Sequence, residues 1–508
     1  MQQLDLLARE HLGVARRVAA YEWLADGVSE DEWLGLRALA GVIARDGTAG
    51  RAVAGAVWLQ DGITEHERAV LTELREFAAG TPFVARISAF PWVRDAITED
   101  ERWMVWGLEE LADYEPQLAS FVLDRAWVQD DVGEHERWMV RNLKELAGVE
   151  PRLANLVVDF PWFQDDVTEH ERRVVWNLKE LHEADRQLAS RVVDFPWFQD
   201  DVNEHERRIV WNLKELAEVE PHLADLVADL PWFRDDVTEY ERWLVWNLQD
   251  LAASEPVLAN LVAGFPWVQD GVTADERWIV RSMNDLATVE PQLASLVIDL
   301  PWLKDDITEH ERRIVWNLKE LATVDLPLAS FVADLPWFRD DVTEHERRIV
   351  WHVKKLATVE PQLASLVADL SWFRDDVTEH ERWLVWHLQD LAASEPELAN
   401  LVASFPWFQD GVTAYERQAI QNLRHIAGAG VDAMVTAPYL EALSPAGAAA
   451  TIALAYLALW APEGLALVVE HPTVADGITE DETVVVSTLW GCTGPTLTSS
   501  RRSSTRPA

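Results

Sequence analysis

Apolar residues recur along the chain with the period of an α-helix, in stretches separated by short polar segments. One stretch contains Ile349, Val353 and Leu356, whose spacing of three or four residues places them on one helix face. Thr343 and Glu346 precede this face with the spacing of a capping box, in which each side chain accepts a hydrogen bond from the backbone N–H of the other residue. The pattern predicts a helix that begins directly after Thr343.

A second, shorter helix is predicted after the first. The first helix is expected to end near Thr358, and Pro361 suits the first turn of the next helix, where a backbone N–H is not needed. Four apolar residues are expected to form the inner face of this second helix: Leu363, Leu366, Val367 and Leu370. Residues 337–342 are expected to form a loop before the capping box.

This pattern is repeated along most of the chain, and a tryptophan marks each repeat. Trp58 and Trp23 lie upstream of the regular series at spacings of 34 and 35 residues. Ten further members, which with these two we call the repeat tryptophans, are spaced by 35 residues: Trp92, Trp127, Trp162, Trp197, Trp232, Trp267, Trp302, Trp337, Trp372 and Trp407. The predicted fold class is all-α, an α-solenoid of about fourteen helix-turn-helix repeats of about 35 residues.

The regularity of the repeats divides the chain into four segments. Residues 1–89 are expected to form N-terminal capping repeats, 90–435 the regular array, 436–490 degenerate apolar repeats and 491–508 a disordered tail. The apolar run 446–461 is shorter than the roughly 20 residues that span a bilayer, so a buried helix is expected there.

The charge of the chain limits its partners. The sequence contains 88 acidic and 44 basic residues, a net charge of −44, and the acidic residues are distributed through the repeats. Such a field repels nucleic-acid phosphates and anionic lipids and favours basic or amphipathic proteins. We therefore expect a protein partner, no nucleic acid and no membrane, and a cytoplasmic location because the first residues lack the pattern of a secretory signal.

The motif W-x-x-D-G-[IV]-[ST]-E-x-E occurs at Trp23 to Glu32 and at Trp58 to Glu67. It resembles tandem repeats found in a group of bacterial proteins, and the resemblance covers nearly the whole chain without implying an activity. The length of the repeat is similar to that of tetratricopeptide repeats, but their W-x2-L-G-x2-Y signature is not present in the sequence.

Two recurring features suggest metal binding, and both have a structural explanation. The acidic segment before the first helix supplies its capping box, and the position of Gly271 or Asp306 within it suits a left-handed turn residue. Histidine recurs in the first helical turn, at His66, His135, His170, His205, His310, His345 and His380. Equivalent residues of stacked helices lie about 8–10 Å apart, too far to share one zinc ion. We expect solvated histidines, no metal and no cofactor.

The sequence also lacks the motifs of common enzymes. No G-x-S-x-G motif, phosphate-binding loop or dinucleotide fingerprint is present in the sequence. A side-chain set that is identical in every repeat is moreover a poor active site, because catalysis needs one asymmetric pocket. The chain is therefore predicted not to be an enzyme.

A second series of tryptophans lies inside the first helix of the repeats. Trp351 is about 200° around the helix from Ile349 and Val353, beside Arg347, and so belongs to the polar side. We call the members helix tryptophans: Trp106, Trp176, Trp211, Trp246, Trp316, Trp351 and Trp386. Some repeats carry a further tryptophan three residues earlier, here called flanking tryptophans: Trp103, Trp138, Trp243, Trp278 and Trp383.

Two interpretations of the helix tryptophans are open. Neighbouring first helices cover the rings, with arginines stacked on them, and this packing is the favoured interpretation. Alternatively, the helix tryptophans form a binding stripe with Arg172, Arg207 and Arg347, and the protein is a non-catalytic interaction scaffold. A structural or charge-shielding acidic array, which imitates nucleic acid or binds basic proteins without a specific partner, is the alternative function.

Overall fold

The computed structural model describes residues 5, 8–9, 11–77, 82–428 and 454, except for 131, 166, 236, 341, 376 and 411. The described residues form helices and their connections, and no strand is present among them. Contacts divide the chain into two compact parts, which are described separately. The first part is Met1–Gly264 with Val268–Val272, and the second part is Phe265–Trp267 with Thr273–Ala508.

In the first part each regular repeat contains a long helix, a short helix and a single helical turn. After α2 (Leu12–Val18), the long helices are α4 (Glu30–Arg45), α7 (Glu65–Glu76), α10 (Glu99–Tyr114), α13 (Glu134–Val149), α15 (Glu169–Ala184), α18 (Glu204–Val219) and α20 (Glu239–Ser254). The short helices are α5 (Gly47–Val53), α8 (Phe83–Ile87), α11 (Pro116–Leu123), α14 (Pro151–Val157), α16 (Arg186–Val193), α19 (Pro221–Ala228) and α21 (Pro256–Ala263). The single turns are α3 (Trp23–Asp26), α6 (Trp58–Asp61), α9 (Pro91–Arg94), α12 (Ala126–Gln129), η1 (Pro161–Phe163), α17 (Pro196–Gln199) and η2 (Pro231–Arg234).

The second part contains the same three kinds of element. Its long helices are α23 (Ala274–Val289), α25 (Glu309–Val324), α28 (Glu344–Val359), α31 (Glu379–Ser394) and α34 (Ala414–Gly428). Its short helices are α24 (Pro291–Ile298), α26 (Leu326–Ala333), α29 (Pro361–Ala368) and α32 (Pro396–Ala403). Its single turns are η3 (Pro301–Lys304), α27 (Pro336–Arg339), α30 (Ser371–Arg374) and α33 (Pro406–Asp410), and α22 (Pro266–Asp270) lies where the two parts divide.

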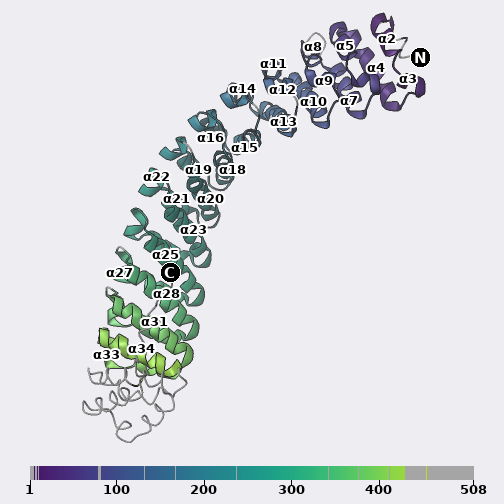
Figure 1. Ribbon diagram of the computed structural model, residues 1–508. Coiled ribbons are helices and arrows are strands. Elements are labelled where there is room, and N and C mark those ends of the chain that lie inside the picture. The colour runs from purple at the N-terminus through teal and green to yellow at the C-terminus, as the bar shows by residue number, and fades with distance from the viewer. Residues whose placement is uncertain are drawn as a thin grey trace, which may run out of the picture. The chain divides into compact units, whose positions relative to one another are not determined.

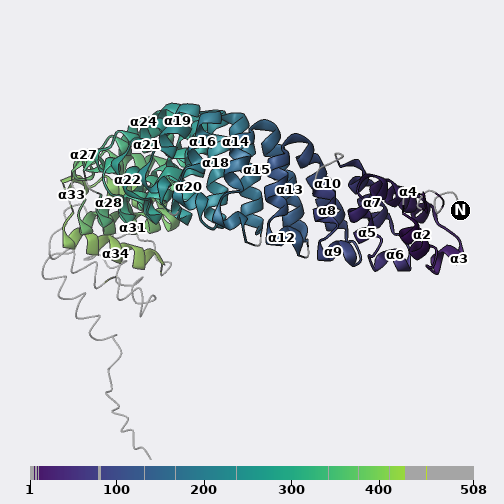
Figure 2. The same cartoon turned by 90° about the horizontal axis from the view of Figure 1, so that it is seen from above.

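Within each part, neighbouring helices pack in pairs. Most long helices contact the next long helix and the short helix that follows them, as α13 contacts α15 and α14. Figures 1 and 2 show the long helices α13, α15, α18 and α20 side by side, with the short helices α14, α16, α19 and α21 along one side of them. The described chain is therefore an all-α repeat structure.

The capping box predicted at Thr343 is confirmed. The backbone N–H of Thr343 donates to the Glu346 carboxylate at 2.6 Å, and the N–H of Glu346 donates to the Thr343 hydroxyl at 3.4 Å. The long helix begins at Glu344 and ends at Val359, and Pro361 opens the next helix as predicted. Local hydrogen bonding and proline geometry thus place the helix boundaries.

Two details of the predicted repeat are wrong. Residues Pro336–Arg339 form the helical turn α27, so the segment 337–342 is not simply a loop. Leu366 is 38% exposed and does not belong to the buried face, whereas Leu363 and Val367 are buried. The helix is only eight residues long, so its buried face is narrower than the predicted stripe.

The predicted left-handed turn is confirmed at glycine and wrong at aspartate. Gly62 and Gly271 have φ angles of 115° and 112°, a region that glycine enters without steric cost. No described residue other than glycine has a positive φ, so Asp306 adopts a different backbone conformation at the equivalent position. The turn therefore tolerates two conformations, and the residue present selects between them.

A hydrogen bond from the repeat tryptophans joins consecutive repeats. The indole N–H of Trp337 donates to the carbonyl of Phe373, the residue directly after the next repeat tryptophan, at 2.6 Å. Equivalent bonds of 2.5–2.9 Å are made by Trp23, Trp58, Trp92, Trp127, Trp162, Trp197, Trp232, Trp267, Trp302 and Trp372. All of these rings are buried. We call this contact the indole link.

None of the described helices is both long and apolar enough to cross a membrane. Apart from Leu454, the predicted apolar repeats 436–490 and the tail 491–508 lie outside the described residues. The four predicted segments, which were based on repeat regularity alone, stay a prediction.

The indole link predicts a difference between two tryptophans of one repeat. Trp337→Phe leaves the buried Phe373 carbonyl without a donor and should lower the free energy of unfolding by about 1–3 kcal/mol. Trp351→Phe changes a ring that is 40% exposed and should have an effect within about 0.5 kcal/mol. Urea unfolding followed by circular dichroism measures both, and equal effects of the two variants would contradict the role of the link.

Candidate functional site

All ten predicted site residues line pockets on the long helices. The helix tryptophans Trp211, Trp246, Trp316 and Trp351 are 40–42% exposed. The other three helix tryptophans, Trp106, Trp176 and Trp386, and the arginines Arg172, Arg207 and Arg347 are half-buried. The structure therefore covers these four rings only in part, and both interpretations stay open for them.

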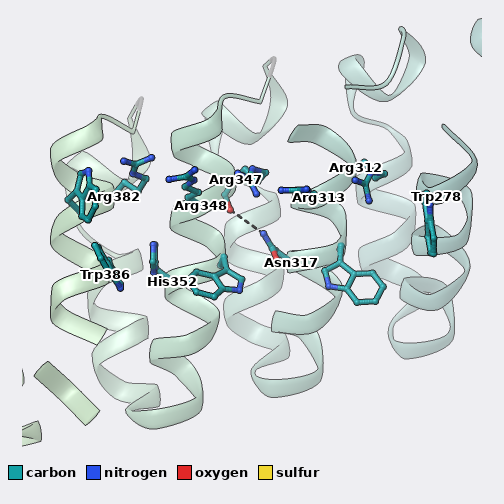
Figure 3. A pocket seen from close by; sticks show the side chains of 12 residues that line it. Trp278, Arg312, Arg313, Asn317, Arg347, Arg348, His352, Arg382 and Trp386 are labelled. Atoms are coloured by element: carbon teal, nitrogen blue, oxygen red, sulfur yellow. Dashed lines mark hydrogen bonds between the residues drawn. The ribbon is translucent and has the colours of Figure 1, made fainter. Parts of the chain in front are cut away.

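The C-terminal pocket lies in the second part and has a volume of about 780 Å³. Its lining contains five arginines and five tryptophans and no carboxylate: Trp278, Arg312, Arg313, Trp316, Asn317, Arg347, Arg348, Trp351, His352, Arg382, Trp383 and Trp386. Figure 3 shows the arginines in one row across neighbouring long helices, while Asn317, His352 and Trp386 lie in a second row about one turn further along. A row of arginines thus runs beside a row of polar and aromatic side chains.

The central pocket has the same composition in the first part, with a volume of about 1090 Å³. Its lining contains six arginines and five tryptophans, with Glu215 as the single carboxylate: Trp138, Arg141, Asn142, Arg172, Arg173, Trp176, Asn177, Arg207, Arg208, Trp211, Asn212, Glu215, Arg242, Trp243, Trp246 and Gln249. A small pocket of about 250 Å³ lies beside Trp103, Trp106 and Trp138 in the same part. In a chain with a net charge of −44, the pockets are locally cationic.

Asparagines bond the backbone at arginine positions of the next repeat. The side-chain amide of Asn142 donates to the backbone carbonyl of Arg172 at 2.8 Å, and Asn177 donates to the carbonyl of Arg207 at 2.9 Å. Asn317 makes the same bond at 3.2 Å in the second part. The sequence interpretation missed these residues, although asparagine follows several helix tryptophans directly and its recurrence was a usable signal.

The long helices α15, α18, α25 and α28 each carry two adjacent arginines, and the two differ in their surroundings. Arg173 and Arg208 form ion pairs with a glutamate one turn earlier, at 2.8 and 2.7 Å. Three others, Arg172, Arg207 and Arg347, make no ion pair among the described residues, and the Nε of each is buried without a hydrogen-bond partner.

Burial lowers the pKa of these three arginines. For Arg172 the loss of hydration on burial lowers the pKa, and the positive charge of Arg173 lowers it further. Burial followed by neighbouring arginines lowers the pKa of Arg207 and Arg347 in the same way. An arginine remains protonated under these conditions. Nearby glutamates, such as Glu169 and Glu309, offset part of the charge without forming an ion pair with these arginines. An anion that entered the pocket would offset more of it.

The cations above the tryptophan rings differ from those predicted. Lysines rather than arginines lie over most helix tryptophans, with Lys179 Nζ 4.9 Å from the ring centre of Trp176 and Lys319 Nζ 4.7 Å from that of Trp316. Arginines lie over the flanking tryptophans, as Arg242 lies 4.8 Å from the ring centre of Trp243. Lys179 and Lys319 each stand three residues after their tryptophan, within reach on one helix face.

Two histidines replace the asparagine in the second part. Burial lowers the pKa of His352 to about 4, against a hydrogen bond with Gln389 that raises it. Burial, and then the nearby Arg424, lower the pKa of His387 to about 4 as well. The His352 ring also stacks against the helix tryptophan Trp386 at 6.2 Å between ring centres. Both histidines are neutral at physiological pH.

The first-turn histidines are not simply solvated as predicted. His170, His205 and His345 are half-buried, and the Nδ1 of each is buried without a hydrogen-bond partner. Within the described residues, no group of three histidine, cysteine or acidic side chains is placed to hold a metal ion.

A comparison with known protein families, with curated proteins and with solved structures finds no match in any of the three. The fold and the pockets define the class of protein by themselves: an all-α repeat protein with tryptophan–arginine pockets on its long helices.

The buried histidines predict a loss of stability in mild acid. The unfolded chain binds protons at the ordinary histidine pKa near 6.5, whereas folded His352 and His387 bind them only near pH 4. Between these values the unfolded state holds more protons, so stability falls as the pH decreases. The double variant His352→Asn, His387→Asn should keep up to about 2 kcal/mol more stability per histidine at pH 5 than the parent does. Urea unfolding at pH 7 and pH 5 tests this, and an unchanged pH dependence would contradict it.

Proposed function

We propose that the protein is a non-catalytic interaction scaffold, an α-solenoid of about fourteen repeats that binds a partner protein along its tryptophan–arginine pockets. The observation that carries the proposal is the exposure of Trp211, Trp246, Trp316 and Trp351, in pockets whose lining also contains three arginines without an ion pair among the described residues: Arg172, Arg207 and Arg347. Tryptophan and arginine are the residues most enriched at the energetic centres of protein interfaces. Exposed apolar rings that lie together on one face are typical of a binding surface.

Two features support a scaffold over an enzyme. The central and C-terminal pockets present nearly the same arginine and tryptophan rows, whereas catalysis needs one asymmetric set of groups. Each long helix contacts mainly its sequence neighbours, as in solenoids, which bind extended partners along one face.

The pocket lining changes the expected chemistry of the partner. The net charge of −44 favours a basic or amphipathic protein. The arginine rows favour instead a partner that presents carboxylates together with apolar groups. We therefore propose an amphipathic partner and not a basic one. Nucleic acid remains disfavoured, because first-turn glutamates such as Glu169 and Glu204 stand beside the arginines.

A specific observation favours the second candidate function, a charge-shielding acidic array. On α7 and α10, burial and then the charges of Asp113, Glu73 and Glu110 raise the pKa of Glu109. Such crowding of carboxylates costs stability and would be relieved by a basic protein. Binding of this kind should be sensitive to salt and indifferent to the identity of the basic partner.

Affinity capture from a native lysate tests the scaffold. The baits are the full chain and a variant with five helix tryptophans changed to alanine: Trp176, Trp211, Trp246, Trp316 and Trp351. A matched control changes five exposed valines at the ends of long helices, which line none of the three pockets: Val149, Val219, Val289, Val324 and Val359.

We expect a protein that the parent and the valine variant retain and that the tryptophan variant loses, with all three equally helical by circular dichroism. If only basic proteins are retained, and these wash off with salt from all three baits, the scaffold is wrong and the acidic array is favoured.

A further inference from the structure

We propose that the pockets bind an acidic peptide segment in the polyproline II conformation, with a carboxylate at every third residue. This inference rests on the proposed scaffold function and names the ligand of the same site. The partner is thus identified by its chemistry: an extended chain in which proline or other apolar residues separate regularly spaced aspartates or glutamates.

The unpaired cations of the lining favour an anionic ligand, although seven of the eleven lining arginines pair with acidic side chains just outside it. Eleven arginines line the two large pockets, and Glu215 is the only carboxylate among their lining residues. Arg172, Arg207 and Arg347 offer a buried Nε that has no partner within the described chain. A carboxylate is the anion that a guanidinium binds with two parallel hydrogen bonds.

The spacing of the repeats selects the conformation of the ligand. Packed helices lie about 8–10 Å apart, so equivalent arginines of successive repeats recur at roughly this distance. A polyproline II helix has three residues per turn and a rise of about 3.1 Å per residue, so every third side chain returns to the same face after about 9.3 Å. A β-strand returns to the same face after about 6.6 Å and does not match.

Tryptophan rings beside the arginines supply an apolar surface for the prolines of the ligand. Trp243 and Trp246 have ring centres 4.5 Å apart at a tilt of 35°, and Trp383 and Trp386 form an equivalent pair. Grooves lined by aromatic rings bind polyproline II segments because the preformed helix loses little entropy on binding. Prolines between the carboxylates would pack on the tryptophans while the carboxylates meet the arginine row.

The glutamates beside the pocket argue against a uniform polyanion. Glu169 and Glu204 lie one turn before Arg173 and Arg208 and already pair with them. A nucleic acid, whose phosphates follow one another along the whole strand, would place charges against these carboxylates as well. A peptide with one carboxylate per three residues would direct its charge mainly to Arg172 and Arg207, which stand in consecutive repeats and make no ion pair among the described residues.

Fluorescence anisotropy with defined peptides tests the inference on the full chain. The probe is a labelled peptide of six Pro-Pro-Glu repeats. Its controls are a peptide of the same composition with the glutamates in adjacent pairs, a peptide of six Pro-Pro-Lys repeats, and an oligothymidylate with a similar number of charges. We expect saturable binding of the regular acidic peptide, at least tenfold weaker binding of the permuted peptide, and no saturable binding of the other two.

A pair of variants locates the binding. Arg172→Gln, Arg207→Gln and Arg347→Gln should together weaken binding of the regular peptide at least tenfold. The control variant Arg152→Gln, Arg186→Gln and Arg339→Gln removes the same charge from positions that line none of the three pockets, and should bind like the parent. Equal binding of the regular and permuted peptides, tighter binding of the oligothymidylate, or equal loss in both variants would overturn the inference.

These outcomes are separable from those of the lysate capture. If the tryptophan variant loses a captured protein but the regular acidic peptide does not bind, the ligand class is wrong and the scaffold function stands. If the capture fails while the regular peptide binds at the arginine row, the ligand class stands and the lysate lacks a partner of this chemistry.

Discussion

The structure depends on one recurring contact, the hydrogen bond from a buried indole N–H to the backbone of the next repeat. A helix pair of this length cannot bury enough apolar surface alone, so each repeat needs its neighbour. Tryptophan meets this need in two ways, because its ring fills the junction and its N–H satisfies a carbonyl that burial would otherwise leave unpaired. Trp337 also packs edge-on against the Phe373 ring, with centres 5.9 Å apart. The contact therefore fixes both the distance and the register between repeats.

The position of this contact determines where binding can occur. The indole links and the short helices take up the junctions between repeats, and the capping boxes use the first-turn glutamates such as Glu346. These contacts do not use the long-helix face that carries the helix tryptophans and the adjacent arginines. The proposed recognition surface thus occupies the part of the repeat that these stabilising contacts do not use.

The sequence was a reliable guide wherever local chemistry decides the structure. Thr343 and Glu346 predicted the start of a helix because a capping box involves only four residues, and Pro361 predicted the next start for the same reason. The exposed side of Trp351 followed from helix geometry alone. The ten candidate residues were chosen from period and type, and all of them line pockets, while their role in binding stays a prediction.

The errors arise where contacts between repeats decide. Leu366 looks apolar and is exposed because the short helix presents only a narrow face to its neighbours. Arg172 and Arg173 are the same residue type at adjacent positions, so the sequence does not distinguish them. Only Arg173 forms an ion pair with a glutamate, because adjacent side chains leave a helix in different directions. The net charge of the chain could not reveal a cationic lining, because an average over all residues hides a row of arginines on one face.

The asparagine bonds have a consequence for how such a protein can change. Asn142 and Asn177 hold the backbone carbonyl of an arginine and not its side chain, so they keep their partner whatever residue stands at that position. Repeats 232–266 and 372–406 differ at only four positions although they lie 140 residues apart, which indicates that whole repeats are copied. A repeat can therefore be duplicated, which lengthens the array, or substituted on its exposed face, which changes the surface offered to a ligand. Neither change disturbs the contacts between repeats.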